Sequence, residues 1–374
     1  MSAAFPMPRQ AAHSVSNVQL IAFYLPQFHP IPENDAWWGE GFTEWTNVKR
    51  AKPNFVGHYQ PHVPTELGYY DLRDPKTRAA QADLARAHGI HGFCYYYYWF
   101  NGKRLLHRPL DEVVQTGQPD FPFCVCWANE NWTRRWDGGN DELLMAQNYS
   151  PENEQGLIAD LVPLFRDPRY IRVNGRPLVL VYRANLLPEP RRATDTFRGV
   201  ARASGEAEPY LAMVHVPGMV APGEWGFDAG VEFPPHSTEV QPLTEHIDRL
   251  NPAFIGDVWD YVSAAQYAIG RPLPDFPLFR GVMVGWDNTP RLQDNGHVFV
   301  NSHPENYRRW LSAVIAQTHQ TKPAGERIVF INAWNEWAEG CYLEPDQQFG
   351  RGYLDATLRA LRTPAAYRET AGLP

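Results

Sequence analysis

The feature that most constrains the fold is an eightfold alternation of short apolar runs with helical or looped segments. Each run is rich in β-branched or aromatic residues and is bounded by a breaker or a polar residue, as buried strands are. Strands alternating with helices form a parallel sheet, and eight such units in 374 residues favour a single closed (β/α)8 TIM barrel. The predicted strands span residues 18–25, 92–100, 121–127, 178–183, 210–215, 228–233, 279–287 and a last run that begins at Ile328.

The segments between the strands predict helices and long, aromatic-rich loops. Asp74 and Pro75 are typical of a helix start. Pro26 to Pro30 follow the first strand in place of a glycine-rich phosphate loop, which counts against a doubly wound dinucleotide fold. We expect a flexible tail over 1–17, the barrel over 18–363 and a second tail over 364–374. The helices are predicted over 74–88, 105–115, 151–166, 190–203, 258–269, 304–318 and 352–361.

The last predicted strand runs into two carboxylates and two tryptophans. Side chains alternate faces along a strand, so Asn332, Trp334 and Glu336 are expected to share one face. Glu339 is out of step by one residue, and both glutamates can face one site only if the chain turns before Gly340. Paired carboxylates beside aromatic rings at a strand end indicate carbohydrate chemistry. The alternative is two solvated acids on a loop.

Polar and aromatic residues also gather at the ends of the other strands. Because these ends meet at one rim of a barrel, the side chains are expected to ring one cavity. A lone strand-end histidine or carboxylate is more often structural, so the hypothesis rests on their joint occurrence. The residues expected to contact substrate are Tyr24, Trp45, Trp99, Trp127, Asn129, Glu130, His215, Glu232, Asp287, Trp334, Asn335 and Trp337.

The loop between the first two strands carries three of the 13 tryptophans together with several phenylalanines and tyrosines. A long loop of this kind is usually functional, and we expect Trp45 and at least one of Trp37 and Trp38 to wall the cleft. The alternative is that these rings plug the flank of the barrel.

Composition and motifs limit the possible ligands. A net charge of −8 gives no basic field for nucleic acid, and no apolar run is long enough to span a membrane. The four cysteines, of which Cys94, Cys124 and Cys126 fall in predicted strands, are expected to be small buried residues. The sequence has no CxxC or HExxH motif, so neither a metal nor a cofactor is expected. A neutral oligo- or polysaccharide fits best, with the cytoplasm as default compartment because residues 1–17 lack the pattern of a signal peptide; the oligomeric state is not indicated.

Two carboxylate pairs could supply the chemistry. One combines Glu130 with Glu336, each of which follows an asparagine, and the other combines Glu336 with Glu339. Arg134 and Arg135 lie near Glu130 in sequence and would hold that carboxylate ionised, which modestly favours the second pair.

Four segments resemble the WbsX-like proteins, which are similar to glycoside hydrolase family 99 and are found in bacterial surface-polysaccharide clusters. The resemblance extends from about Val18 to Leu361. It implies a (β/α)8 barrel and an endo-acting, retaining hydrolase of an α-linked, mannan-like polysaccharide. A glycosyltransferase of polysaccharide synthesis and a non-catalytic sugar-binding barrel are the alternatives. The segments are Phe23–His29, Gly41–Val48, Trp127–Trp132 and Trp334–Gly340.

The resemblance also implies roles for individual residues. Glu336 would be the base towards the sugar 2-hydroxyl, and Glu339 the acid and then the base for water. Tyr24 resembles a subsite tyrosine. Ala338 and Asn332 depart from the histidine and the further acid expected in family 99, which bears on sugar specificity. Because like charges held close together cannot both ionise freely, we expect the resting proton on Glu339 more often than on Glu336.

Overall fold

The computed structural model describes residues 17–134, 142–236 and 238–362. The two predicted tails, apart from Asn17, lie outside these residues, as does Arg135. No helix in the described segments is long and apolar enough to cross a lipid bilayer.

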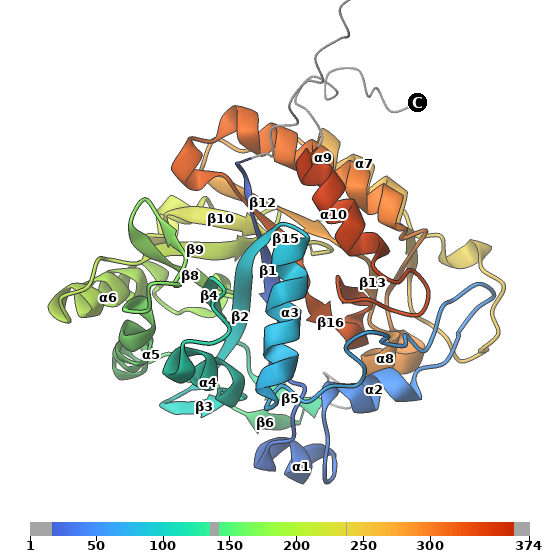
Figure 1. The fold of residues 1–374 in the computed structure, drawn as a ribbon, viewed down its shortest axis with the longest axis horizontal. Coiled ribbons are helices and arrows are strands. Elements are labelled where there is room, and N and C mark those ends of the chain that lie inside the picture. The colour runs from blue at the N-terminus through green and yellow to red at the C-terminus, as the bar shows by residue number, and fades with distance from the viewer. Residues whose placement is uncertain (1–16, 135–141, 237, 363–374) are drawn as a thin grey trace, which may run out of the picture.

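Eight of the described strands form a closed parallel barrel (Figure 1). Strands that are consecutive in this ring pair side by side, and β1 pairs with both β2 and β15, which closes it. The predicted (β/α)8 architecture is therefore confirmed. The strands are β1 (Gln19–Tyr24), β2 (Ile90–Phe100), β4 (Phe123–Trp127), β8 (Arg176–Val181), β9 (Tyr210–His215), β10 (Ala229–Glu232), β12 (Leu278–Met283) and β15 (Ile328–Asn332).

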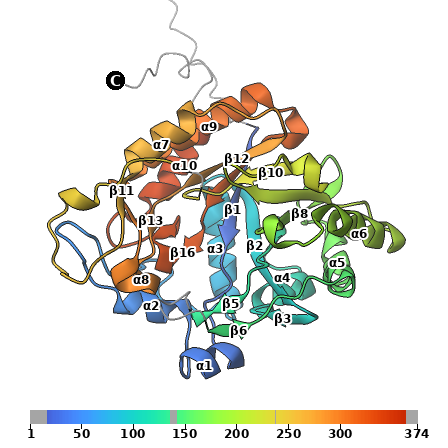
Figure 2. The same ribbon diagram turned by 180° about the vertical axis from the view of Figure 1, so that it is seen from behind.

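Helices cover the outside of the ring (Figures 1 and 2). Helix α3 packs on β2, and its N-cap Asp74 accepts a hydrogen bond from the backbone N–H of Lys76, as the sequence predicts. Helix α9 packs against both α7 and α10 on one flank. The helices are α3 (Pro75–Ala87), α4 (Arg108–Thr116), α5 (Pro151–Phe165), α6 (Pro190–Ala203), α7 (Tyr261–Gly270), α9 (Pro304–Thr321) and α10 (Gly352–Arg362).

Short elements in the βα loops build the rim at the C-terminal ends of the strands. The loop after β1 holds α1 (Pro32–Trp38) and α2 (Glu44–Arg50), and the loop after β4 holds the hairpin of β5 (Trp132–Thr133) and β6 (Leu143–Met145). A small three-stranded sheet joins β11 (Val258–Asp260), β14 (Val298–Val300) and β13 (Trp286–Asp287), which is followed by α8 (Thr289–Leu292). Outside the rim elements lie β3 (Lys103–Leu105) and β7 (Arg172–Val173).

The last strand ends earlier than expected. Regular pairing in β15 stops at Asn332, and residues Asn335–Glu336 form a separate strand, β16, paired with β17 (Cys341–Tyr342). The turn between them is the 3-10 helix η7 (Trp337–Glu339), which Gly340 ends in a left-handed conformation with φ of 57°. The expected shared face of Asn332, Trp334 and Glu336 is therefore wrong, because strand alternation does not continue past Asn332. The expected turn before Gly340 is present.

The cysteines are buried, as predicted, and all four are free thiols.

Two strand positions require glycine, because the neighbouring backbone leaves no room for a side chain. A Cβ on Gly281 in β12 would lie 2.3 Å from the carbonyl oxygen of Glu232, and one on Gly92 in β2 would lie 2.5 Å from that of Pro122. The barrel thus fixes glycine at these positions by close approach.

Gly281→Ala should destabilise the protein by about 1–3 kcal/mol, because the added methyl group forces β10 and β12 apart. The matched control is Gly199→Ala on α6, where an added Cβ meets no atom within 4 Å. That change should stabilise the protein by up to about 1 kcal/mol through helix propensity. Urea unfolding of both variants measures the difference, and equal midpoints for Gly281→Ala and the parent would contradict the close-approach argument.

Candidate functional site

A small hollow at the C-terminal ends of the barrel strands brings three predicted glutamates together. We call it the glutamate pocket; its volume is about 40 Å³. Its walls come from β2, from the ends of β4, β8 and β10, and from α8, β16 and η7. The lining residues are Tyr96, Tyr98, Ala128, Glu130, Trp132, Tyr182, Phe233, Arg291, Glu336 and Glu339.

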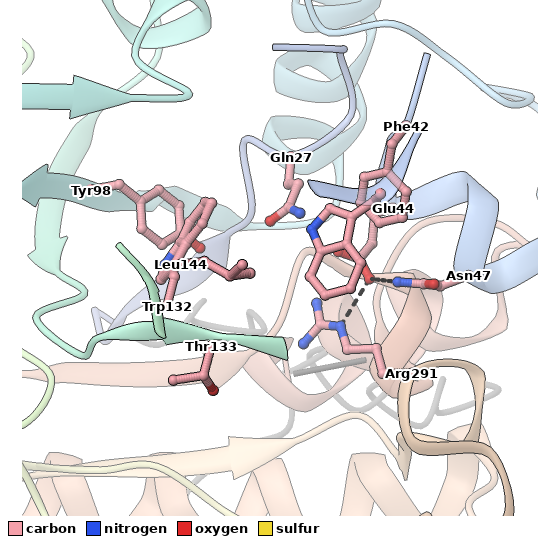
Figure 3. Close-up of a pocket in the computed structure, with 10 residues that line it drawn as sticks. Gln27, Phe42, Glu44, Asn47, Tyr98, Trp132, Thr133, Leu144 and Arg291 are labelled. Carbon is pink, nitrogen blue, oxygen red and sulfur yellow. Dashed lines mark hydrogen bonds and ion pairs between the residues drawn. The ribbon is translucent and has the colours of Figure 1, made fainter. Parts of the chain in front are cut away.

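A second hollow, also of about 40 Å³, adjoins the first across Tyr98, Trp132 and Arg291. In Figure 3, Arg291 and Glu44 lie on one side of this hollow, with Tyr98 and Trp132 on the opposite side. Trp38 also lines it, so one part of the aromatic-loop prediction holds. The two hollows thus form one cleft, and they meet where the Arg291 guanidinium faces two aromatic side chains.

Arg291 binds three carboxylates at once. Its Nε donates to Glu44 at 2.8 Å, one terminal nitrogen donates to Glu336 at 2.9 Å, and the other donates to Glu339 at 2.5 Å. The side chains of Arg291, Glu44 and Glu336 are nearly inaccessible to solvent, and that of Glu339 is 18% exposed. One positive charge therefore faces three acidic groups in a poorly solvated place, so the group as a whole favours holding a proton.

Burial sets the protonation of these acids. It raises the pKa of Glu336 well above its usual range; the charges of Glu339 and Glu44 add to this, and Arg291 opposes it. Burial also raises the pKa of Glu339, while Arg291 opposes the rise. Burial therefore favours a shared proton on this pair of glutamates. The expectation that the proton resides on Glu339 more often than on Glu336 stays a prediction.

The cationic neighbour of Glu130 also differs from the one that the sequence predicts. Arg134 pairs with Glu142 rather than with Glu130. The cation beside Glu130 is Arg183 at 3.4 Å, and burial outweighs it, so the pKa of Glu130 is raised. The expectation that arginines near in sequence hold Glu130 ionised is therefore wrong for Arg134.

Each Asn–Glu pair uses its asparagine as a clamp. The Asn335 side-chain oxygen accepts from the backbone N–H of Leu25 at 2.8 Å, and its amide nitrogen donates to the carbonyl of Leu25 at 3.0 Å. Asn129 makes the same two bonds with the backbone of Arg183, at 2.7 and 3.0 Å. Both asparagines are fully buried, so they hold strand ends together while the next residue, Glu336 or Glu130, faces the pocket.

A buried carboxylate supports the turn from behind. Glu344 accepts hydrogen bonds from Tyr70 Oη at 2.8 Å, Gln81 Nε2 at 2.7 Å and Trp337 Nε1 at 2.6 Å. Trp337 follows Glu336 directly and is the first residue of η7, which ends at Glu339. The hydrogen bond to Trp337 therefore fixes the segment that carries both glutamates. Burial raises the pKa of Glu344 to about 7.

Several predicted contact residues lie elsewhere in the fold. Tyr24 is buried and donates to Gln81 of α3 at 2.7 Å, so it faces outward from β1. Glu232 is bound by Arg271 and by Arg280, the latter at 2.8 Å, and accepts from the N–H of Gly281. The prediction that Tyr24 and Glu232 line one cavity with the other strand-end residues is therefore wrong. Their side chains point to the outer helices and loops.

His215 and Asp287 also lie away from the glutamate pocket. His215 is partly exposed at the end of β9, with its ring against Phe276. Asp287 accepts from His58 and Gln60, both at 2.6 Å, and lines a different cavity. Their strand-end positions were predicted correctly, but the loops that follow carry them to other partners.

The predicted tryptophans are packing residues. Trp45 donates to the Tyr70 carbonyl at 2.8 Å and packs on Trp337, which favours the alternative role of plugging the flank. Trp127 donates to the carbonyl of Trp99 at 3.3 Å on the outer side of the barrel. Trp334 is buried against Phe93. None of these five rings lines the two hollows, among the residues that the structure describes.

Sequence reasoning missed the residues that complete the pocket. Arg291 and Glu44 come from a four-residue helix and a loop helix, with no motif around Arg291 to mark it. Tyr96 and Tyr98 did have a signal, because alternate members of the Tyr95–Tyr98 run must face the barrel interior.

Comparisons with known proteins agree with the fold. The family model described as glycosyltransferase WbsX matches residues 20–357. Two proteins from Xanthomonas campestris pv. campestris, both described as uncharacterized protein WxcX, are 48% identical over 342 residues, or 91% of this chain. The match covers 49% of their length, so the chain spans about half of these relatives.

Solved structures resemble the chain at low sequence identity. An endo-α-mannosidase of glycoside hydrolase family 99 from Bacteroides thetaiotaomicron, solved with bis-tris propane, has a TM-score of 0.56 and 15% identity, covering 93% of this chain and 97% of that one. A glycoside hydrolase-like protein has a TM-score of 0.56 and 13% identity, covering 97% and 98%. At these identities the likeness establishes the shared barrel fold.

Glu344 should make stability depend on pH. Its pKa is about 7 in the folded protein against a usual value of 4.5, so its contribution is fully present below pH 4.5 and is lost as the pH rises through about 7. Relative to Glu344→Gln, which cannot ionise, the parent should lose up to about 3 kcal/mol between these limits. Urea unfolding at pH 5 and pH 8 measures this, and a pH-independent difference between the two proteins would contradict it.

Proposed function

Since the chain belongs to the WbsX family, we propose that it is a retaining glycoside hydrolase that cleaves an α-linked, neutral bacterial polysaccharide such as a mannan-like one. The observation that carries the proposal is the pair Glu336 and Glu339, which face one pocket and share one guanidinium. Two coupled carboxylates with raised pKa supply one acid and one base, which glycoside cleavage requires.

The proposed first step uses the substrate's own 2-hydroxyl. Glu336 removes the hydroxyl proton, the oxygen attacks C1, and the bond from C1 to the leaving oxygen breaks as Glu339 protonates that oxygen. A 1,2-anhydro sugar results. In the second step Glu339 takes a proton from water and the water oxygen attacks C1. The bond between C1 and the 2-oxygen of the anhydro sugar breaks, and the 2-oxygen takes its proton back from Glu336. Two inversions at C1 give net retention.

The scheme requires Glu336 to be ionised and Glu339 to be protonated when the substrate is bound. A sugar hydroxyl that donates a hydrogen bond to Glu336 stabilises its ionised form, which lowers its pKa and leaves the proton on Glu339. The two hollows share Tyr98, Trp132 and Arg291, so a sugar ring that extends across both would contact these three side chains.

The family's description favours a second candidate, a glycosyltransferase. Nucleotide-sugar donors carry a pyrophosphate, which needs cationic or metal partners. Arg291 is the one Lys or Arg among the described residues that line the two hollows, and it is bound to three glutamates. The charge of the cleft thus supports a neutral substrate and hydrolysis over transfer.

Substitution of the pair separates the two roles. Glu339→Gln should abolish cleavage of glycosides with poor leaving groups and should partly spare activated aryl glycosides, which need no acid. Glu336→Gln should impair both, and a substrate without the 2-hydroxyl should not turn over. Cleavage of a 2-deoxy substrate with a glycosyl adduct trapped on Glu336 or Glu130 would overturn the anhydro-sugar route.

Substitution of Glu44 tests how its charge affects the pKa of the two proposed catalytic glutamates. Its charge raises the pKa of both Glu336 and Glu339, so Glu44→Gln should lower both. The alkaline limb of the pH–rate profile, where the acid loses its proton, should then move to lower pH. Glu142→Gln, at an exposed glutamate paired with Arg134, is the matched control and should leave the profile in place. A Glu44→Gln limb at unchanged or higher pH would contradict the electrostatic account.

A further inference from the structure

A separate cavity lies behind the turn that carries the two glutamates. Its volume is about 500 Å³, within the range of small-molecule sites and far larger than the glutamate pocket. Its walls come from the loop after β1, the small sheet of β11, β13 and β14, and residues 340–353. It shares no described lining residue with the glutamate pocket, and Gly340, next to Glu339, is where the two approach each other.

The polar groups of this cavity form a built and ordered cluster. Asp287, buried at the base of the loops, accepts from His58 Nε2 and Gln60 Nε2 at 2.6 Å and from the N–H and hydroxyl of Thr289 at 3.0 and 2.6 Å. Tyr342 donates to Asp346 at 2.9 Å and contacts His62 Nδ1 at 2.5 Å. Nε2 of His62 has no hydrogen-bond partner among the described residues and lies 3.9 Å from Asp287.

This arrangement is suited to binding rather than to bond cleavage. Both oxygens of Asp287 are occupied by donors, and Asp346 also accepts from the N–H of Phe349 at 2.7 Å. Neither carboxylate is therefore placed to give or take a proton. Asp287 instead fixes His58, and its hydrogen bonds and those of Tyr342 hold the cavity wall in one shape.

The lining also restricts the class of ligand. It contains Asp248, Asp287 and Asp346 but no lysine or arginine among the described residues, which disfavours an anion. Seven aromatic side chains provide flat apolar faces, and histidine, asparagine and glutamine side chains provide hydrogen-bonding edges. Flat rings combined with such edges match the apolar faces and hydroxyl rim of a neutral sugar. The seven rings belong to Phe55, Tyr59, Trp286, Phe299, Tyr342, Phe349 and Tyr353.

We propose that this cavity is a second glycan-binding site, which holds one or two neutral sugar units of the polysaccharide between Trp286 and His62 without cleaving them. The choice of a sugar as ligand rests on the proposed function. A sugar hydroxyl can donate a hydrogen bond to His62 Nε2, which lies 3.9 Å from a carboxylate oxygen of Asp287 and makes no hydrogen bond of normal length to the described residues. A chain held here lies one glycine from the catalytic turn, so it would be retained between successive cleavage events.

The test measures binding without turnover. The probe is α-mannotriose, with trigalacturonic acid as the anionic counterpart, titrated by calorimetry into the Glu336→Gln/Glu339→Gln double variant and soaked into its crystals. Within that background, His62→Phe removes the ring nitrogens and Val300→Trp fills the cavity, whereas Ala203→Trp at an exposed position of α6 is the control.

We expect density for mannotriose between Trp286 and His62, a loss of affinity of about tenfold or more in His62→Phe and Val300→Trp, no loss in Ala203→Trp, and no binding of trigalacturonic acid here. Sugar bound only at the glutamate pocket would overturn this proposal and leave the proposed function standing. Sugar bound only in this cavity would support it while opposing the hydrolase. Mannotriose affinity that is unchanged by both cavity variants, or binding at neither place, would overturn it.

Discussion

The placement of the glutamates depends on two asparagine amides that replace regular strand pairing. Beyond Trp127 and Asn332 the barrel strands stop, yet Glu130 and Glu336 must stay fixed at its mouth. Asn129 and Asn335 achieve this by binding both backbone groups of one residue on the neighbouring strand end. Each pair of hydrogen bonds replaces one pair of backbone hydrogen bonds of a β-sheet, with the asparagine side chain in the place of a strand residue. It leaves the following residue free to face the cavity.

Arg291 then determines what those glutamates can do. Its guanidinium binds Glu44, Glu336 and Glu339, while burial raises the pKa of both Glu336 and Glu339. A stronger positive environment would leave both catalytic candidates ionised and without an acid. A weaker one would protonate both and remove the base. Three carboxyl groups and one guanidinium in a buried site lie between these limits, so one carboxyl can be protonated while another is ionised. Acid–base chemistry on a neutral sugar needs this combination.

The sequence predicts the barrel well because periodic apolar runs follow local rules. It also predicts Glu336 and Glu339, since they sit just after the last strand and before a glycine that permits the turn. It fails for side chains whose partners come from distant loops: Asp287 is satisfied by His58, and Glu232 by Arg280. Arg291 could not be found at all, because a short helix with no motif carries it. Such partners are a property of tertiary contact, which spacing along the chain does not encode.

The family's description and the site geometry point to different chemistry, and one assay separates them. The purified chain is incubated with a neutral, α-linked bacterial surface polysaccharide, with and without added nucleotide sugars, and new reducing ends and their initial anomeric configuration are followed by NMR. The account predicts new reducing ends of retained configuration in the absence of any nucleotide sugar. A polysaccharide that yields no reducing ends and instead gains sugar only when a nucleotide sugar is supplied would contradict it.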